Sequence, residues 1–513
     1  MPLVPVAVAV WAGQSQIGGS RSVKADITGY EGLATDANCF IWDVPTQAIV
    51  TLVPGSAELQ PSLALMDPAY TDTVGPLGEF DRFFRRDNPS TPLYHFKYAI
   101  GGSRFTSAGS LGADANWAAG VSGGAREKML AQWNNFVTAL AAAGKTPVVT
   151  WMATDLGYSS GIDSTEATNY QADMTALIAW WRTNMIGSTA RLTIARACGT
   201  ISGFAFISTI RTAQVNIQAA APTLIDLLDT DGFELIADNV HFSAASHMRH
   251  GELLYCHYAN RWHPMQDRLN GSAIFPTDFY RGADLRNTYI GATKTGKISV
   301  LWDMVRGRTG PITFTQTTDL NRPSLATETI GGLAVRTARF TGSPMRMTRS
   351  TGRMAGTTPF GLCIAARIAT PTGPSCLIGE GLSTNGNGFI QFRTDVDGLF
   401  ESLSRDSTGV IVTGPTDWSA AAAAGDVMRT YIVGCDAAGN VTPQSDGTIG
   451  AVQATEIDTM GTSNRVSIGV FSANATLYYA DADYGEFWWT NIEPDSAYRT
   501  KVRTYMQWRW GTP

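Results

Sequence analysis

The first strand of this chain and the turn after it restrict the fold more than any other feature. Val4 to Trp11 (VPVAVAVW) is an apolar run typical of a buried β-strand, and Gly13-Gln14-Ser15-Gln16 follows it directly. A serine in a glycine-containing turn after such a strand is typical of the carboxyl edge of a parallel sheet, where ligands bind. We therefore expect an α/β fold that exposes Ser15 at that edge.

Strands and helices alternate through the first half of the chain. After the first strand, the pattern predicts strands at residues 94–100, 146–151, 191–195 and 224–228, and helices at 126–143, 166–182, 211–219 and 244–260. This alternation is typical of a parallel sheet packed between helices, so we predict a three-layer α/β sandwich.

The pattern changes at about Gly296, where short apolar or alternating runs are separated by clusters of Gly, Asn, Asp, Ser and Thr. Short strands at this spacing predict an all-β jelly-roll sandwich. Because 513 residues exceed one ordinary core, we expect one domain over 1–265, a linker or domain tail over 266–298, and a second domain over 299–513.

The composition argues against several classes of protein. A net charge of −6 does not suit a general nucleic-acid binder, and no apolar run is long enough to span a bilayer. The N-terminal run contains Pro2 and Pro5 and lacks a basic segment before it, so we expect no signal peptide. A virion-associated or cytoplasmic protein, or one exported without a classical signal, remains open. The six cysteines form no C-x-x-C pair, and we expect them to be free and buried.

Asp238-Asn239-Val240-His241 supplies a base and an acid to orient it within one short turn. A serine hydroxyl is a poor nucleophile at neutral pH and needs a base that accepts its proton during attack. A histidine does this when a carboxylate orients its ring and stabilises the imidazolium. All six histidines precede residue 264, so we assign any hydrolytic chemistry to the first half.

A structural role is the alternative for each of these residues. Ser15 could cap a helix, but the matching D-x-x-H turn favours catalysis. We expect His247 and His250 at the surface or at a helix end, and His95 in the core. A metal site built from His241, His247 and His250 would match no standard spacing, and we expect neither a metal nor a cofactor.

Four blocks, in order, resemble those of one enzyme family. They are GQSQ (Gly13–Gln16), KYAIGGS (Lys97–Ser103), RTAQ (Arg211–Gln214) and DTDGFELIADNVHFSAASH (Asp229–His247). Over roughly Val4 to Tyr258 the chain resembles SGNH-type (GDSL-type) hydrolases of the carbohydrate-esterase branch, which contains sialate O-acetylesterases and acetylxylan esterases. The resemblance implies a flavodoxin-like α/β sandwich with carboxylic ester hydrolase activity.

The resemblance also implies a role for each block. Ser15 would be the nucleophile, His241 the base and later the acid, and Asp238 the residue that orients His241. The backbone N–H groups of Ser15 and of Gly101 or Gly102 would form the oxyanion hole, in which each donor contributes about 2.7–4 kcal/mol.

One block departs from the family pattern. The branch carries W-x-Q-G-E after its third strand, with the glutamine as a further oxyanion donor, whereas this chain has Trp151-Met152-Ala153-Thr154-Asp155. Alanine cannot donate a hydrogen bond, so we expect this role to be lost or taken over by Thr154 or Gln16. The residues expected to contact substrate are Gln14, Gln16 and Asp155.

The second half has a looser resemblance. Gln316–Ser343 and Arg503–Gly511 look like the opening and closing segments of concanavalin A-like (laminin-G-like) jelly-roll domains, which implies a carbohydrate-binding or adhesive module. Trp488, Trp489, Trp508 and Trp510 could form a sugar-stacking platform, but aromatic residues in a β-sandwich are more often core, and we favour the core.

We therefore predict a serine esterase that removes O-acetyl groups from a polysaccharide or a sialic-acid-like sugar. One alternative is a catalytically weak adhesin or structural fibre protein on an esterase fold, which the change at Ala153 keeps open. A phage tail or receptor-binding protein would combine both roles, and we would expect such a protein to be a trimer. A lipase or thioesterase for longer acyl chains is a further alternative.

Overall fold

The computed structural model divides into two compact units, Met1–Asn270 and Gly271–Pro513, which we describe separately. The structure describes residues 2–19, 21–27, 30, 33–54, 73–106, 113–199, 201–267, 272–281, 300–301, 314–316, 322–330, 333–341, 347–349, 359–368, 375–381, 389–394, 400–405, 411–413, 427–446, 448–449, 465–468 and 481–512.

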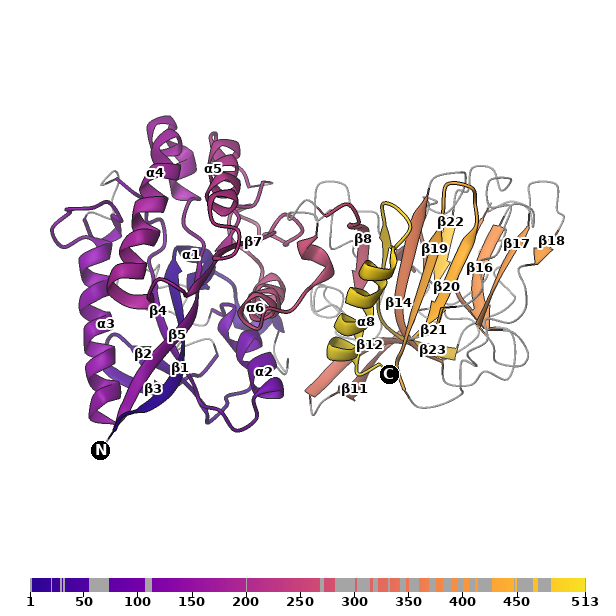
Figure 1. The fold of residues 1–513 in the computed structure, drawn as a ribbon, viewed down its shortest axis with the longest axis horizontal. Coiled ribbons are helices and arrows are strands. Elements are labelled where there is room, and N and C mark those ends of the chain that lie inside the picture. Colours follow the sequence, from indigo (N-terminus) through magenta and orange to yellow (C-terminus); the bar gives the residue numbers. More distant parts are fainter. Residues whose placement is uncertain are drawn as a thin grey trace. The chain divides into compact units, whose positions relative to one another are not determined.

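The first unit is built around a seven-stranded sheet with the strand order β3-β2-β4-β1-β5-β6-β7 (Figure 1). The strands are β1 (Val4–Gly13), β2 (Cys39–Asp43), β3 (Ala48–Thr51), β4 (Leu93–Ala99), β5 (Lys145–Thr154), β6 (Arg191–Ala195) and β7 (Ile225–Leu228). Only β3 pairs antiparallel, with β2; the other neighbouring strands in this sheet are parallel. The central strand β1 therefore delivers Ser15 to the middle of the carboxyl edge.

Helices pack against both faces of this sheet. They are α1 (Ser15–Gly18), α2 (Leu77–Asp87), α3 (Ala125–Ala142), α4 (Ser164–Trp181), α5 (Ile207–Ala220) and α6 (Ala244–Tyr258). Successive side chains of a strand point to opposite faces. In β4, His95 bonds Asp81 of α2 at 2.7 Å, while its neighbour Phe96 lies against Trp133 and Phe136 of α3. The two helices therefore cover opposite faces.

The predicted elements of the first unit are confirmed, with ends that differ by a few residues. β2, β3 and α2 were not predicted from the sequence. The expectation for His95 is also confirmed, because its side chain is fully buried and accepts a 2.9 Å hydrogen bond from the Trp11 indole. The mixed α/β character of this unit is confirmed, and the three-layer, flavodoxin-like arrangement stays a prediction.

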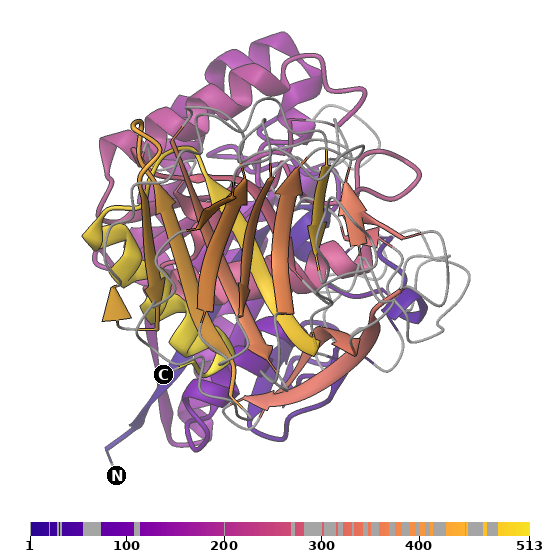
Figure 2. The ribbon, with the colours of Figure 1, turned by 90° about the vertical axis from the view of Figure 1, so that its right-hand side faces the viewer.

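The described strands of the second unit form two eight-stranded sheets. One follows the order β18-β17-β16-β15-β22-β13-β10-β9, and the other β11-β12-β23-β14-β19-β20-β21 with β8 also paired to β23 (Figures 1 and 2). The strands are β8 (Pro276–Arg281), β9 (Val300–Leu301), β10 (Phe314–Thr315), β11 (Ser324–Ile330), β12 (Leu333–Thr341), β13 (Met347–Arg349), β14 (Phe360–Ile368), β15 (Ser375–Gly381), β16 (Phe389–Thr394), β17 (Phe400–Arg405), β18 (Ile411–Thr413), β19 (Arg429–Cys435), β20 (Val441–Ser445), β21 (Thr448–Ile449), β22 (Arg465–Ile468) and β23 (Asp481–Thr490). The mostly-β character is confirmed, and the jelly roll stays a prediction.

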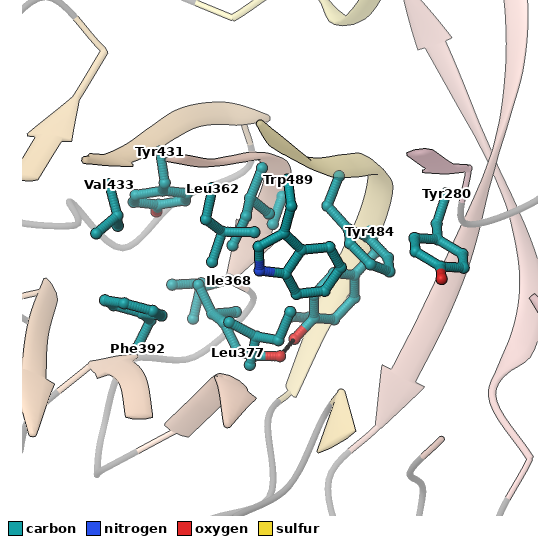
Figure 3. Close-up of a cluster of buried hydrophobic side chains, with 14 of the residues drawn as sticks. Tyr280, Leu362, Ile368, Leu377, Phe392, Tyr431, Val433, Tyr484 and Trp489 are labelled. Carbon is teal, nitrogen blue, oxygen red and sulfur yellow. Dashed lines mark hydrogen bonds between the residues drawn. The ribbon is translucent and has the colours of Figure 1, made fainter. Parts of the chain in front are cut away.

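One hydrophobic cluster joins these two sheets (Figure 3). Leu362, Tyr431 and Trp489 come from one sheet and Leu377 and Phe392 from the other, and each is at most 1% exposed. The Tyr484 hydroxyl donates a 2.6 Å hydrogen bond to the Leu377 carbonyl, so the buried phenol has a partner across the core. The residues of this cluster all come from the second unit.

A helix covers part of the outer face of one sheet. The helix is α8 (Ser496–Trp510), and its Trp510 packs so close to β23 that a Cβ on Gly485 would lie 2.7 Å from the indole. Trp508 and Trp510 therefore belong to a helix rather than to strands of the sandwich. The preference for core is confirmed for Trp488, Trp489 and Trp510, which are at most 1% exposed, while Trp508 is half-buried.

β8 lies within the stretch 266–298 that was expected to be a linker or domain tail. It pairs antiparallel with β23 from Pro276 opposite Thr490 to Arg281 opposite Glu486. This part of the stretch is therefore a strand of the second unit. The exact domain limits predicted from the sequence stay a prediction.

All six cysteines are free and buried, as expected. Within the described ranges, no helix combines the length and apolar character needed to cross a membrane.

Candidate active site

Ser15 lies where β1 ends, between two almost fully buried glutamines. β1 reaches Gly13, and α1 begins at Ser15, so the serine is the first residue of a one-turn helix. Its side chain is half-buried rather than exposed as expected, whereas Gln14 and Gln16 are each 1% exposed. The short helix is capped by Gly19, whose φ of 75° is the left-handed conformation that glycine adopts without strain.

The Asp238–His241 turn is closed by the Asp238 carboxylate. One oxygen, Oδ2, lies 2.7 Å from Nδ1 of His241, and the other accepts the backbone N–H groups of Val240 (2.9 Å) and His241 (3.0 Å). Asn239 has a φ of 57°, a conformation that asparagine tolerates better than most residues and that tightens the turn. The carboxylate therefore orients both the imidazole ring and the backbone that carries it.

Gln16 connects this turn to Ser15 across more than 200 residues of sequence. Its side-chain amide donates to the Val240 carbonyl at 2.6 Å, and its side-chain oxygen accepts the Phe242 N–H at 3.0 Å. These two partners stand on either side of His241. The residue after the serine therefore holds the backbone segment that carries the histidine.

The electrostatics of the pair favour a neutral histidine and an ionised aspartate at neutral pH. Burial lowers the pKa of His241 below its usual value of 6.5, although the hydrogen bond and charge of Asp238 act in the opposite direction. Burial raises the pKa of Asp238, but hydrogen bonds from His241 and from the Val240 N–H outweigh it and bring that pKa to about 2. The imidazole is thus available as a base.

Gln14 holds the loop that contains the expected oxyanion glycines. Its side-chain amide donates to the Ser103 carbonyl, and the Gly13 carbonyl accepts the Ile100 N–H at 3.0 Å. Gly102 has a φ of 71°, which suits glycine and forms the turn that follows β4. The loop with Gly101 and Gly102 is therefore fixed to the backbone on the N-terminal side of Ser15.

Thr154 and Asp155 are fully buried beneath the Ser15 turn. The Thr154 hydroxyl accepts the Leu156 N–H at 3.4 Å, and the Asp155 carboxylate accepts backbone N–H groups of Gln14 and Ile17. Neither side chain has the solvent access that contact with a substrate or an oxyanion needs.

The three residues expected to contact substrate all have partners inside the protein. Gln14 bonds the loop after β4, Gln16 bonds the Asp238–His241 turn, and Asp155 bonds the Ser15 turn. Their burial favours a role in holding the site over direct contact with a sugar. Any role of Thr154 or Gln16 as an oxyanion donor is likewise without support from their contacts.

Arg21 is a site residue that the sequence analysis missed. Its Nη1 lies 3.3 Å from Asp238 Oδ2, its side chain is 41% exposed, and its backbone φ is 64°. The charge of Arg21 also contributes to the lowered pKa of His241. An arginine six residues after the serine belongs to no spacing rule, so only the folded structure brings it to the pair.

The positions of His247 and His250 correct an expectation. Both lie on α6 and are fully buried rather than at the surface or at a helix end. Burial lowers the pKa of both, that of His250 to about 3, so both are neutral at physiological pH. Within the described part of the chain, no group of three or more His, Cys, Asp or Glu side chains is placed to hold a metal ion.

The RTAQ block supports a neighbouring loop. Arg211 forms a two-pronged ion pair with Asp231, with both N–O distances 2.7 Å, and Asp231 also accepts the Gly199 N–H at 2.9 Å. Gln214 of the same helix accepts the Ala197 N–H at 3.0 Å. The block thus positions the segment after β6, and we assign it no contact with substrate.

Comparison with known proteins gives a family for the first half of the chain. Residues 5–260 match the family model described as carbohydrate esterase, sialic acid-specific acetylesterase. The chain belongs to this family through its first half. It is therefore a carboxylic ester hydrolase, and the class of reaction is that of a carbohydrate O-acetylesterase. No curated protein matches the chain.

Solved structures give more distant likenesses. A protein from Arabidopsis thaliana shares 17% identity over 50% of this chain and 98% of its own, with a TM-score of 0.40. A point mutant of the NanB sialidase of Streptococcus pneumoniae shares 12% over 33% of this chain and 27% of its own, with a TM-score of 0.26. The IT-sialidase CBM40 of Ruminococcus gnavus shares 13% over 29% and 85%, with a TM-score of 0.25. Likenesses of this size support no statement about function.

Proposed function

We propose that the first unit removes O-acetyl groups from a polysaccharide or a sialic-acid-like sugar, with Ser15, His241 and Asp238 as a catalytic triad. The hydrogen bonds of Gln16 support this proposal best, because they tie the residues on both sides of His241 to the residue after Ser15. The 2.7 Å contact between Asp238 and the imidazole adds the orienting acid that such a base requires.

In the first half of the proposed reaction, His241 accepts the Ser15 proton while the Ser15 oxygen attacks the acetyl carbon. The resulting oxyanion accepts hydrogen bonds from the backbone N–H of Ser15 and of Gly101 or Gly102. His241 then returns the proton to the sugar oxygen, which leaves as a hydroxyl. Water, activated by the same histidine, releases acetate from the acetyl-enzyme in the second half.

Ala153 leaves this oxyanion hole without a side-chain donor from the strand beside β1. Ala153 is fully buried near the end of β5, and the neighbouring Thr154 is buried as well. Removal of one oxyanion donor typically lowers kcat by about 10²–10³-fold. We therefore expect slower turnover than in an esterase whose oxyanion hole has three donors.

The direct test is hydrolysis of p-nitrophenyl acetate by the wild-type protein beside Ser15→Ala. We expect clear turnover in the wild type and a background rate in the variant. The reason is that Gln16, the residue after Ser15, bonds the backbone on both sides of His241. Equal rates in the two proteins would contradict the proposed nucleophile. Activity that rises from acetyl to octanoyl esters would favour a lipase or thioesterase instead.

A catalytically weak adhesin or fibre protein, including a phage tail protein that deacetylates and binds a host glycan, is the second candidate. The alanine at position 153 is the observation that favours it. Glycan-array binding by Ser15→Ala, together with a trimer in native mass spectrometry, would support this candidate. A monomer that binds no glycan would contradict it.

A further inference from the structure

The turn that carries Ser15 rests on a single buried carboxylate. Asp155 Oδ1 accepts the Gln14 N–H at 2.5 Å, and Asp155 Oδ2 accepts the Ile17 N–H at 2.8 Å. These two amides stand on either side of Ser15 in the sequence. Each carboxylate oxygen therefore holds one side of the nucleophile's turn.

The fit between Asp155 and this turn is close. Thr154 pairs with Ala12 in the sheet, so Asp155 lies beside Gly13. A Cβ on Gly13 would lie 1.8 Å from Asp155 Oδ1, a distance that no side chain can adopt. The glycine of the GQSQ block is thus required because the carboxylate occupies the space of a side chain.

Asp155 is itself fixed from the opposite side. The Leu156 carbonyl accepts the Tyr170 hydroxyl of α4 at 2.6 Å and the Gln214 side-chain amide of α5 at 3.3 Å. Two helices therefore hold the segment that follows β5. The carboxylate is a fully buried support rather than a mobile loop residue.

We propose that Asp155 is the positioning residue for the nucleophile, and that its ionised carboxylate keeps the Gln14–Ile17 turn in the geometry in which Ser15 attacks. This inference rests on the proposed function, because it assigns a role to Asp155 only if Ser15 reacts. Asp155 acts through the backbone of the turn and does not contact the substrate.

Ionisation matters because both oxygens accept from a backbone N–H. A proton on either oxygen would place a donor against an amide donor and weaken one of the two bonds. Burial raises the pKa of Asp155 to about 6, although the turn's N–H groups lower it. The titratable groups of the described segments that face it are Tyr158 and Tyr170, whose own pKa values burial raises, so neither changes charge near pH 6.

Asp155→Asn tests the proposal, and Asp163→Asn is its matched control. An asparagine keeps the size of the side chain but turns an NH₂ toward one of the two amides. Asp163 also accepts two backbone N–H groups, those of Thr165 and Glu166 at 2.9 Å each, but both bond the same oxygen, so asparagine can replace it. Both variants lose one carboxylate, but only Asp155→Asn changes a side chain that bonds the Ser15 turn.

We expect Asp155→Asn to lower kcat/KM for p-nitrophenyl acetate by about 10–100-fold, because small displacements of a reacting group cost this much. On the acid side, log(kcat/KM) of the wild type should fall with a slope near two, from His241 and Asp155. The slope in Asp155→Asn should be near one. Asp163→Asn should match the wild type in rate and slope.

A wild-type rate and slope in Asp155→Asn would overturn the inference while leaving Ser15 as the nucleophile. If the variant fails to fold by circular dichroism, the pH dependence of organophosphate labelling of Ser15 in the wild type decides. A slope of two supports the inference and a slope of one overturns it. Activity that survives Ser15→Ala would overturn the proposed function itself, and the inference with it.

Discussion

Asp155 and Asp483 are fully buried carboxylates, one in each unit, and their partners differ in kind. Asp155 is held by neutral backbone N–H groups on either side of Ser15. Asp483 of β23 is held by Arg339 of β12 at 2.8 Å and by Arg367 of β14 at 2.6 Å. Among the described residues, the hydrogen-bond partners of the first carboxylate are therefore neutral, while the second contacts arginines from the strands on both sides.

This difference shows two uses of a buried charge. Asp483 links three adjacent strands, and its loss would remove the carboxylate oxygen that both guanidinium groups contact. Asp155 shapes a single turn and can gain a proton near neutral pH, because burial raises its pKa to about 6 and the hydrogen bonds from neutral N–H groups lower that pKa only in part. The partners of Asp483 are charged, whereas the partners that the structure describes for Asp155, beside the candidate nucleophile, are neutral.

Asp238 is a third carboxylate for this comparison, and its partner, the His241 imidazole, can itself gain or lose a proton. We expect Asp238→Asn to lower kcat by about 10⁴-fold, because the amide would favour the wrong tautomer of His241. Steady-state kinetics with p-nitrophenyl acetate measures this loss, with Asp163→Asn as the control. A decrease of less than about 10-fold would remove Asp238 from the proposed triad.

Asp483→Ala should have the largest effect on stability. Removing one partner of a buried ion pair typically costs about 3–5 kcal/mol, and here two arginines would lose the carboxylate that they share. We expect faster hydrogen exchange in β12, β14 and β23 and unchanged esterase activity. Arg339→Met, which leaves Arg367 beside the carboxylate, is the control and should cost less. Wild-type exchange in Asp483→Ala would contradict the comparison.

Gln16→Ala tests how the position of His241 affects activity when no charge is changed. It breaks the two hydrogen bonds beside His241 and leaves every carboxylate in place. We expect a decrease in kcat/KM of about 10²-fold from the displaced histidine. Gln171→Ala, which removes an exposed amide on α4, is the matched control. A normal rate in Gln16→Ala would show that Asp238 alone positions the histidine.

The smallest expected effect is a pH-dependent change in stability. The pKa of Asp155 is raised from 3.8 to about 6 in the folded protein, so the native state binds more protons than the unfolded state between these values. Wild-type stability should therefore increase relative to Asp155→Asn as the pH falls through this window, by on the order of 2 kcal/mol. Urea denaturation of both proteins at pH 7 and pH 4 measures it. A constant difference would mean that Asp155 carries no unbalanced charge.

The elements of the first unit were predictable because their periodicity is regular. Val4–Trp11 and the four predicted helices are recognisable from pattern alone. α2 was missed because it is short, with charged residues among its phenylalanines (LGEFDRFFRRD), and its apolar face becomes evident only against Trp11 and Trp151.

The proposed reacting groups and the residues beside them could be predicted from the sequence, but the backbone contacts that Gln16 and Asp155 make could not. Ser15 and His241 stand in recognisable short motifs. Asp155 and Gln16 act through backbone partners that are 138 to 226 residues away, and no local pattern encodes such contacts. His247 and His250 were wrongly expected at the surface or at a helix end. The helix that carries them, α6, is buried along most of its length, and the sequence pattern does not show this burial.

The pairing of β8 with β23 determines where a fragment that contains the second unit should begin. A fragment that starts at residue 299, the predicted domain start, would lack β8 and would leave Glu486 to Thr490 of β23 with one uncovered edge. Uncovered edges recruit strands from other molecules and promote aggregation. The second unit should therefore be expressed from before Pro276, with its first strand attached.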